Sequence, residues 1–245
     1  MNGKEIKKTL KKYGRYVWEL VKLSLPSTFM YACLGTALML LTFKGETLKW
    51  TGSELAWTVV LILGAAAYNA LMAWANGGSQ YEMLVSGNVK RMSAAEFEGG
   101  YKMSNHKEAK EYRVWKGFVF GAITSIITIV FGILFGCYQT QIDAKELEGG
   151  VNVLLLLGFF LTGWSLIPLY LMNAANITIS YFLSCLFALI PIAVSGAFYI
   201  AGAYARRNKR LREQLIAERA AAAQENKVKK INYGGLPGTK PKKRK

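Results

Sequence analysis

Five long runs of the chain contain no residue that carries a charge and no histidine. They are 18, 22, 22, 22 and 27 residues long and cover residues 26–43, 55–76, 117–138, 151–172 and 177–203. A helix needs about 20 apolar residues to cross a hydrocarbon core of roughly 30 Å. Buried helices of soluble proteins keep a polar stripe toward water, and none of these runs has one. The pattern predicts an all-α, polytopic membrane protein with five hydrophobic segments.

The same runs argue against membrane-spanning strands. A barrel strand is about ten residues of alternating polarity, whereas residues 153–157 read Val-Leu-Leu-Leu-Leu without a break. A helix satisfies all of its own backbone hydrogen bonds in lipid. We therefore expect each run to be helical.

The segments that flank the runs suggest three regions. In residues 1–25, apolar side chains recur at helical spacing among lysines, which predicts a basic amphipathic helix lying on anionic headgroups; a solvated charged helix is the alternative. Residues 26–203 form the predicted transmembrane domain, with a cytoplasmic loop at 77–116. Residues 204–245 are predicted to be a basic helix that ends in a disordered tail.

Basic residues are distributed unevenly among the segments between the runs. The N-terminus has seven Lys or Arg, the 77–116 loop seven and the tail 14, against two in residues 44–54 and one in residues 139–150. The positive-inside rule places the first three regions in the cytoplasm. That assignment requires residues 151–203 to cross the membrane an odd number of times. A re-entrant or broken helix within 151–203 meets this requirement, and five crossings with an outside tail is the alternative.

Small residues gather on one face of the third run. Gly117, Gly121, Ser125, Gly132 and Gly136 fall on this face, together with Thr128. Such faces let helix backbones approach closely in lipid, so this face packs either against another helix of the same chain or against a second copy. In the second run, Asn69 is expected to form a hydrogen bond across a helix interface.

Polar residues and prolines interrupt the apolar sequence of residues 151–203. Broken hydrophobic segments near mid-membrane often mark a transport site, which makes Trp164, Ser165, Asn173 and Asn176 candidate binding residues. An ordinary tight turn between two helices is the alternative.

The sequence offers no set of catalytic or metal-binding residues. No nucleophile, zinc, phosphate-loop or dinucleotide motif is present. The single histidine, His106, has no second histidine to share a metal site, and Cys33, Cys137 and Cys185 all fall within or at the end of predicted spans. We therefore predict no enzymatic activity, no cofactor and no metal.

These patterns favour a non-enzymatic scaffold or accessory subunit in the plasma membrane of a bacterium. A small channel or transporter with a path near residues 165–180 is the alternative, and an insertase-like factor with a basic tail is a further one. The predicted partners are the lipid bilayer, with anionic headgroups bound by the N-terminus and the tail, and a membrane protein or a second copy of the chain. Nucleic acid is not expected, with ribosomal RNA as the exception.

Overall fold

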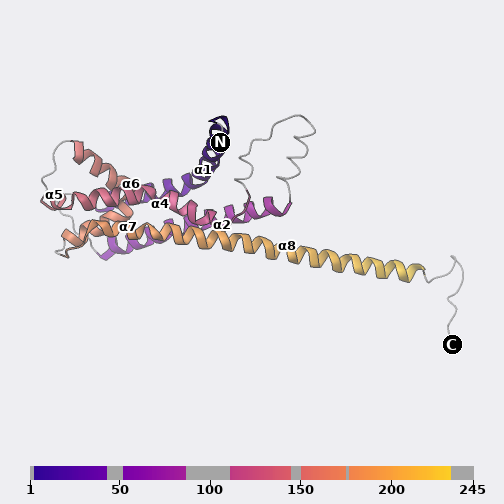
Figure 1. Cartoon of the computed structure of the whole chain (residues 1–245). Coiled ribbons are helices and arrows are strands. Elements are labelled where there is room, and N and C mark those ends of the chain that lie inside the picture. The colour runs from indigo at the N-terminus through magenta and orange to yellow at the C-terminus, as the bar shows by residue number, and fades with distance from the viewer. Residues whose placement is uncertain (1–2, 43–51, 87–110, 145–149, 175–176, 233–245) are drawn as a thin grey trace. The chain divides into compact units, whose positions relative to one another are not determined.

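The computed structural model describes residues 3–42, 52–86, 111–144, 150–174 and 177–232, and every element in these ranges is helical. The helices are α1 (Gly3–Thr42), α2 (Gly52–Ser86), α4 (Lys116–Cys137), α5 (Gln139–Ala144), α6 (Gly150–Ala174), the 3₁₀ turn η2 (Tyr181–Leu183), α7 (Ser184–Phe187) and α8 (Leu189–Asn232) (Figure 1). The predicted all-α class is confirmed.

Five of these helices are long and apolar enough to cross a membrane. The apolar stretches are Tyr16–Leu41, Ala56–Val85, Lys116–Cys137, Asn152–Asn173 and the beginning of Tyr181–Glu225. Large apolar side chains on them, such as Phe29, Leu63 and Ile126, are more than half exposed, as expected for side chains whose solvent is lipid. The prediction of a multi-pass membrane protein with five hydrophobic segments is confirmed.

The predicted region boundaries at residues 25 and 203 both fall inside a helix, the first in α1 and the second in α8. Helix α1 continues through Pro26, so the predicted boundary after residue 25 falls inside one helix; Figure 1 shows that this helix bends, and a proline is a usual cause of a bend. Within α8, the chain divides into two units after Ala203, at the predicted start of the basic region. Residues 233–245, the predicted disordered tail, lie outside the described residues.

Helix α6 is broken at Thr162, whose backbone is not helical (φ −127°, ψ 16°). The rings of Phe159 and Tyr170 lie 5.6 Å apart, although eleven residues of a straight helix would separate them by about 16 Å. The two arms, residues 150–161 and 163–174, therefore fold back on each other. Each arm has 12 residues, a length of about 18 Å, which is little more than half of a hydrocarbon core of roughly 30 Å.

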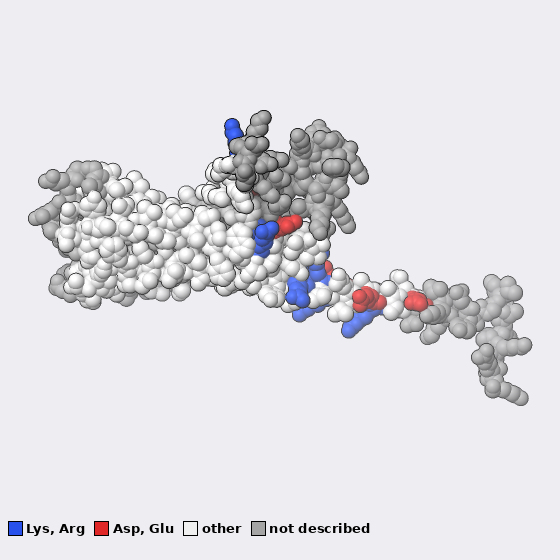
Figure 2. All heavy atoms as spheres, in the orientation of Figure 1, with Lys and Arg blue, Asp and Glu red and all other residues white. Residues whose placement is uncertain are grey.

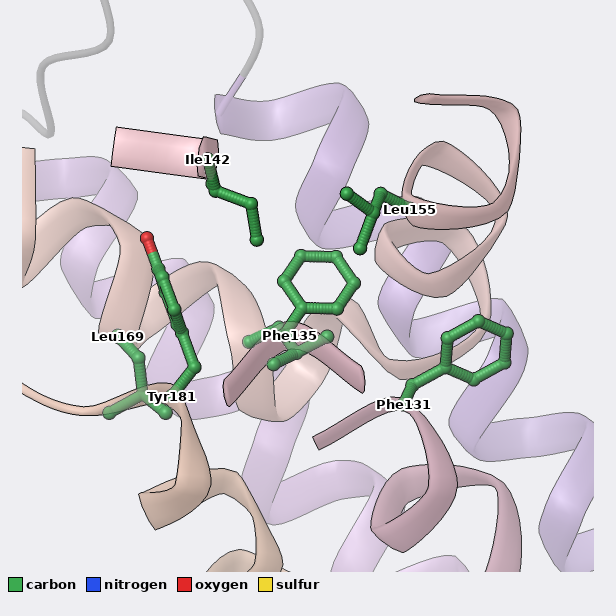
Figure 3. Close-up of a cluster of buried hydrophobic side chains, with 7 residues drawn as sticks. Phe131, Phe135, Ile142, Leu155, Leu169 and Tyr181 are labelled. Carbon is green, nitrogen blue, oxygen red and sulfur yellow. The ribbon is translucent and has the colours of Figure 1, made fainter. Parts of the chain in front are cut away.

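The two ends of the helical bundle can be named by their residues. The Lys116 end contains Tyr16, Gln80, Lys116 and Tyr199, and the hairpin end contains Gln139, Ile142 and Tyr181. Helix α4 runs from the Lys116 end to the hairpin end. Both arms of α6 approach from the hairpin end, because Leu155 and Leu169 pack in one cluster with Ile142 and Tyr181. Figure 3 shows Phe135 in the middle of this cluster, with Leu155 and Leu169 on different sides of it.

The turn of the hairpin is buried in the middle of the bundle. Residues 162–167 are all buried, whereas most of the first arm is exposed. A Cβ added to Gly35 of α1 would lie 2.5 Å from the carbonyl oxygen of Phe160, and one added to Gly163 would lie 2.9 Å from the oxygen of Gly35. The backbones of α1 and the turn are thus in direct contact, and only glycine leaves room for that contact.

Because the backbones touch at Gly35, a methyl group added there should destabilise the protein. We expect Gly35→Ala to lower the free energy of unfolding by about 1–3 kcal/mol, because overpacking forces the backbone to shift. Unfolding can be followed by circular dichroism during titration with denaturing detergent. Gly64→Ala is the matched control, since Gly64 is also helical and has no heavy atom within 4 Å of an added Cβ. Equal effects of the two substitutions would contradict the contact.

Candidate functional site

The small-residue face of α4 is covered by the following helices of the same chain. An added Cβ would lie 2.6 Å from Tyr199 Cβ at Gly117 and 2.5 Å from Ile192 Cα at Gly121, and Ser125 donates a 2.8 Å hydrogen bond to the Ala188 carbonyl. Toward the hairpin end, an added Cβ at Gly132 would lie 3.2 Å from Ser184 Cβ, and one at Gly136 would lie 2.7 Å from the Phe182 ring. Thr128 of this face is also buried. The structure thus packs this face against helices of the same chain, which is the first of the two predicted alternatives.

Asn69 connects α2 to α8 in the interior of the bundle. Its side chain is fully buried. The amide nitrogen donates to the Pro191 carbonyl at 3.3 Å and to the Ser195 hydroxyl at 3.0 Å, and the Ser195 hydroxyl lies 3.2 Å from the amide oxygen. Both polar atoms of Asn69 are therefore used in holding two helices together.

The candidate binding residues near the hairpin are mostly paired with their own chain. The Ser165 hydroxyl lies 2.9 Å from the Ser184 hydroxyl. Asn173 donates to the Ile179 carbonyl at 2.9 Å and accepts from the Ile179 backbone N–H at 2.6 Å. Asn176 lies outside the described residues. Ser165 and Asn173 thus attach the hairpin to the segment that follows it.

Trp164 differs from these residues. Its ring packs against Tyr31 of α1 at 4.9 Å and meets the edge of Phe187 at 6.4 Å. The side chain is 1% exposed, and its indole N–H has no hydrogen-bond partner among the described residues. Burying a hydrogen-bond donor without a partner in an apolar interior costs free energy. The surroundings of the Trp164 indole nitrogen are therefore a candidate binding position for a hydrogen-bond acceptor.

Polar residues on α1 and α2 that the sequence analysis did not single out face the interior in the same half of the bundle. On α1, Ser24, Ser27 and Tyr31 are buried and follow each other at intervals of three and four residues. On α2, Asn76 and Gln80 continue the face that carries Asn69. The spacing of these polar residues within the otherwise apolar helices was the signal in the sequence that could have identified them.

Aromatic and polar groups close the Lys116 end of the bundle. Tyr112 stacks on Tyr199 at 5.2 Å, and the Tyr199 hydroxyl lies 2.6 Å from the Gln80 side-chain oxygen. Lys116 is 1% exposed, donates to the Glu111 carbonyl and lies 5.5 Å from the centre of the Tyr16 ring. Tyrosine and lysine are common where helices leave the bilayer. These contacts join α1, α2, α4 and α8 at that boundary.

The polar groups inside the helical bundle can form hydrogen bonds, and they do not form a metal site. In the part of the chain that the structure describes, no three His, Cys, Asp or Glu side chains gather into a metal-binding group. The three cysteines are free thiols, and His106 lies outside the described residues. Hydroxyl, amide and indole groups can orient water or a neutral polar group, and they hold no charge in the middle of the bundle.

No protein-family model matches the chain, and no curated protein and no solved structure is detectably similar to it. Function must therefore be argued from the geometry and the charge of the chain itself.

The Asn69–Ser195 pair gives a prediction about the interior. We expect Asn69→Ala and Ser195→Ala to be coupled by about 0.6–2 kcal/mol in a double-mutant cycle of unfolding free energy, because each removes the partner of the other. Asn69→Ala combined with Thr36→Ala is the control, since the Thr36 hydroxyl bonds within its own helix to Ala32. If both pairs of substitutions were simply additive, the interhelical hydrogen bond would not be formed.

Proposed function

We propose that the chain is a non-enzymatic membrane scaffold or accessory subunit that binds anionic lipid surfaces through one strongly cationic face. The observation that carries this proposal is the fold-back of α6, shown by the 5.6 Å contact of Phe159 with Tyr170. A helix that enters and leaves from the same end does not count as a crossing. With α1, α2, α4 and α8 as four crossings, both termini and the 77–116 loop face the same side.

This topology separates the charges of the protein. The shared side carries 28 of the 31 Lys and Arg and ten of the 15 Asp and Glu, a net charge of +18. The opposite side carries three basic and five acidic residues, a net charge of −2. The positive-inside rule, which counts Lys and Arg, favours a cytoplasmic location for this shared side, and a net charge of this size attracts anionic surfaces.

A cluster of exposed cations follows directly after the last apolar stretch. It consists of Arg206, Arg207, Lys209 and Arg212, which are exposed on α8, and of Arg210 between them, which is half-buried. Figure 2 shows blue side chains on this helix, whereas the visible described surface around the hairpin end is white. A basic residue near a charged membrane contributes about 1 kcal/mol of attraction. Five of them together can hold a segment on anionic headgroups.

The same features support a location and a second candidate function. Short loops and a compact chain fit the plasma membrane of a bacterium, whose inner leaflet would supply the anionic lipid. The polar side chains inside the bundle favour, as a second candidate, a protein that admits polar groups into one half of the membrane, such as a small transporter or an insertase-like factor.

The proposal predicts that charge on α8 controls binding to anionic vesicles. Replacing Arg206, Arg207, Lys209, Arg210 and Arg212 by Gln should weaken the binding of nanodisc-embedded protein to vesicles that contain anionic phosphatidylglycerol. Binding of the unaltered protein should also fall with added salt, because screening shortens the reach of exposed charges. Vesicle co-flotation at several salt concentrations measures both effects.

A matched variant of the same helix controls for changes in its surface. Ala220→Gln, Ala221→Gln and Ala222→Gln alter exposed residues of α8 without changing the charge, and binding should be unaffected. Equal binding of all variants, or equal binding to neutral phosphatidylcholine vesicles, would overturn the proposal. So would a C-terminal tag that faces the side of the membrane opposite to an N-terminal tag.

A further inference from the structure

Four buried polar atoms in the bundle have no hydrogen-bond partner among the described residues and lie in one half of it. They are the Ser27 hydroxyl, the Tyr31 hydroxyl, the Asn76 amide nitrogen and the Trp164 indole nitrogen. A folded protein leaves few such groups unpaired, and in lipid no solvent is present to pair them. Four in one region therefore require a common explanation.

Along the axis of the bundle, these atoms lie either beside Tyr31 or between Tyr31 and the Lys116 end. The Trp164 ring packs on Tyr31 at 4.9 Å, and the Tyr31 hydroxyl faces the Asn69 side chain without forming a hydrogen bond of good geometry. Helices α1 and α2 are antiparallel, since Leu34 and Leu38 pack with Ala65, whereas Leu23 packs near Ala73. From the level of Tyr31 and Asn69, both Ser27 and Asn76 therefore lie toward the Lys116 end.

Ser27, Tyr31, Asn69 and Asn76 cover a length of about two helical turns along the bundle. Ser27 is four residues from Tyr31, a rise of about 6 Å along a helix, and Asn76 is seven residues from Asn69, a rise of about 10 Å. Gln80 continues the same face of α2 to the Lys116 end. Toward the hairpin end, Leu34, Leu38, Ala65 and Ile167 form an apolar cluster between the helices, and the buried hydroxyls of Ser165 and Ser184 are paired with each other.

We propose that Ser27, Tyr31, Asn76 and Trp164 line a hydrated seam that opens toward the Lys116 end and ends at the hairpin turn. The chemistry of the four groups selects its occupant. The indole and the amide nitrogen donate only, whereas the two hydroxyls donate and accept. Water supplies both kinds of partner and is the usual occupant of polar interior sites, whereas apolar interiors stay dry.

Such a seam would make the two halves of the membrane unequal. On the Lys116 side, water reaches Trp164 near mid-membrane, so a polar group entering from that side keeps hydrogen-bond partners. On the other side, the α6 hairpin and its apolar cluster block the path. The inference extends beyond the proposed binding of anionic lipid and does not depend on it, because it concerns the interior of the bundle alone.

Silver ions provide a test, since Ag⁺ is close to water in size and replaces the proton of a thiol (RSH + Ag⁺ → RSAg + H⁺). Single cysteines are introduced as Ser27→Cys, Asn76→Cys or Leu38→Cys after Cys33, Cys137 and Cys185 are replaced by Ser. Leu38 is the matched control because it lies on the same face of α1 as Ser27 and is equally buried, at 0% exposure. The full-length protein is reconstituted in vesicles, treated with Ag⁺ from one side, unfolded and labelled with maleimide.

We expect Ag⁺ added on the side of the tail to block Ser27→Cys and Asn76→Cys at least about tenfold faster than Leu38→Cys, because an apolar interior excludes water. The seam is refuted if both thiols react as slowly as Leu38→Cys, if Leu38→Cys reacts as fast as they do, or if they react only from the opposite side. Each variant is first required to unfold at the same detergent concentration as its cysteine-free parent, so that a misfolded variant is not mistaken for an open seam.

Discussion

The fold depends on a backbone contact in the middle of the bundle, where the turn of α6 meets α1. Gly35 and Gly163 let the two backbones touch, and the turn that this contact protects would otherwise expose unpaired backbone groups to lipid. The buried residues 162–167 supply that protection. Because the turn is held there, both arms of α6 extend toward the same end of the bundle, and the proposed topology therefore counts only the other four long helices as crossings.

The positions of charged residues along the sequence were sufficient to predict the five long apolar helices, but they did not predict the hairpin in α6. Charge-free runs identify five apolar segments because a charge in lipid is costly. The fourth run, 151–172, looks like any other span, and its break at Thr162 lies before the prolines and asparagines that first drew notice. The break is decided by tertiary contacts with Gly35 and Tyr31, which no local pattern contains. The counts of basic residues favoured an odd number of crossings in residues 151–203, and a hairpin in α6 is compatible with that interpretation.

In the candidate site, too, the sequence predicted which residues pack or bond, but not which residues they contact. The glycines of α4 and Asn69 were identifiable as helix-packing residues from spacing and burial arguments, but their partners, α7 and α8, were not. Ser165 and Asn173 were expected to line a path, and their hydrogen bonds instead close the hairpin onto Ser184 and Ile179. The small-residue face is used inside the chain, so a scaffold role is better supported by the cationic face than by helix packing between copies. The unpaired polar atoms near Trp164 were recognisable only once three separate helices, α1, α2 and α6, were placed together.

A distance across α6 tests the central claim most directly. Spin labels at Leu154→Cys and Met172→Cys, both exposed positions, can be measured by pulsed electron paramagnetic resonance in a cysteine-free background in lipid. A straight helix would separate the two backbone positions by about 27 Å. The folded-back hairpin predicts a narrow distribution at a clearly shorter distance, and a distribution centred at the straight-helix value would contradict it.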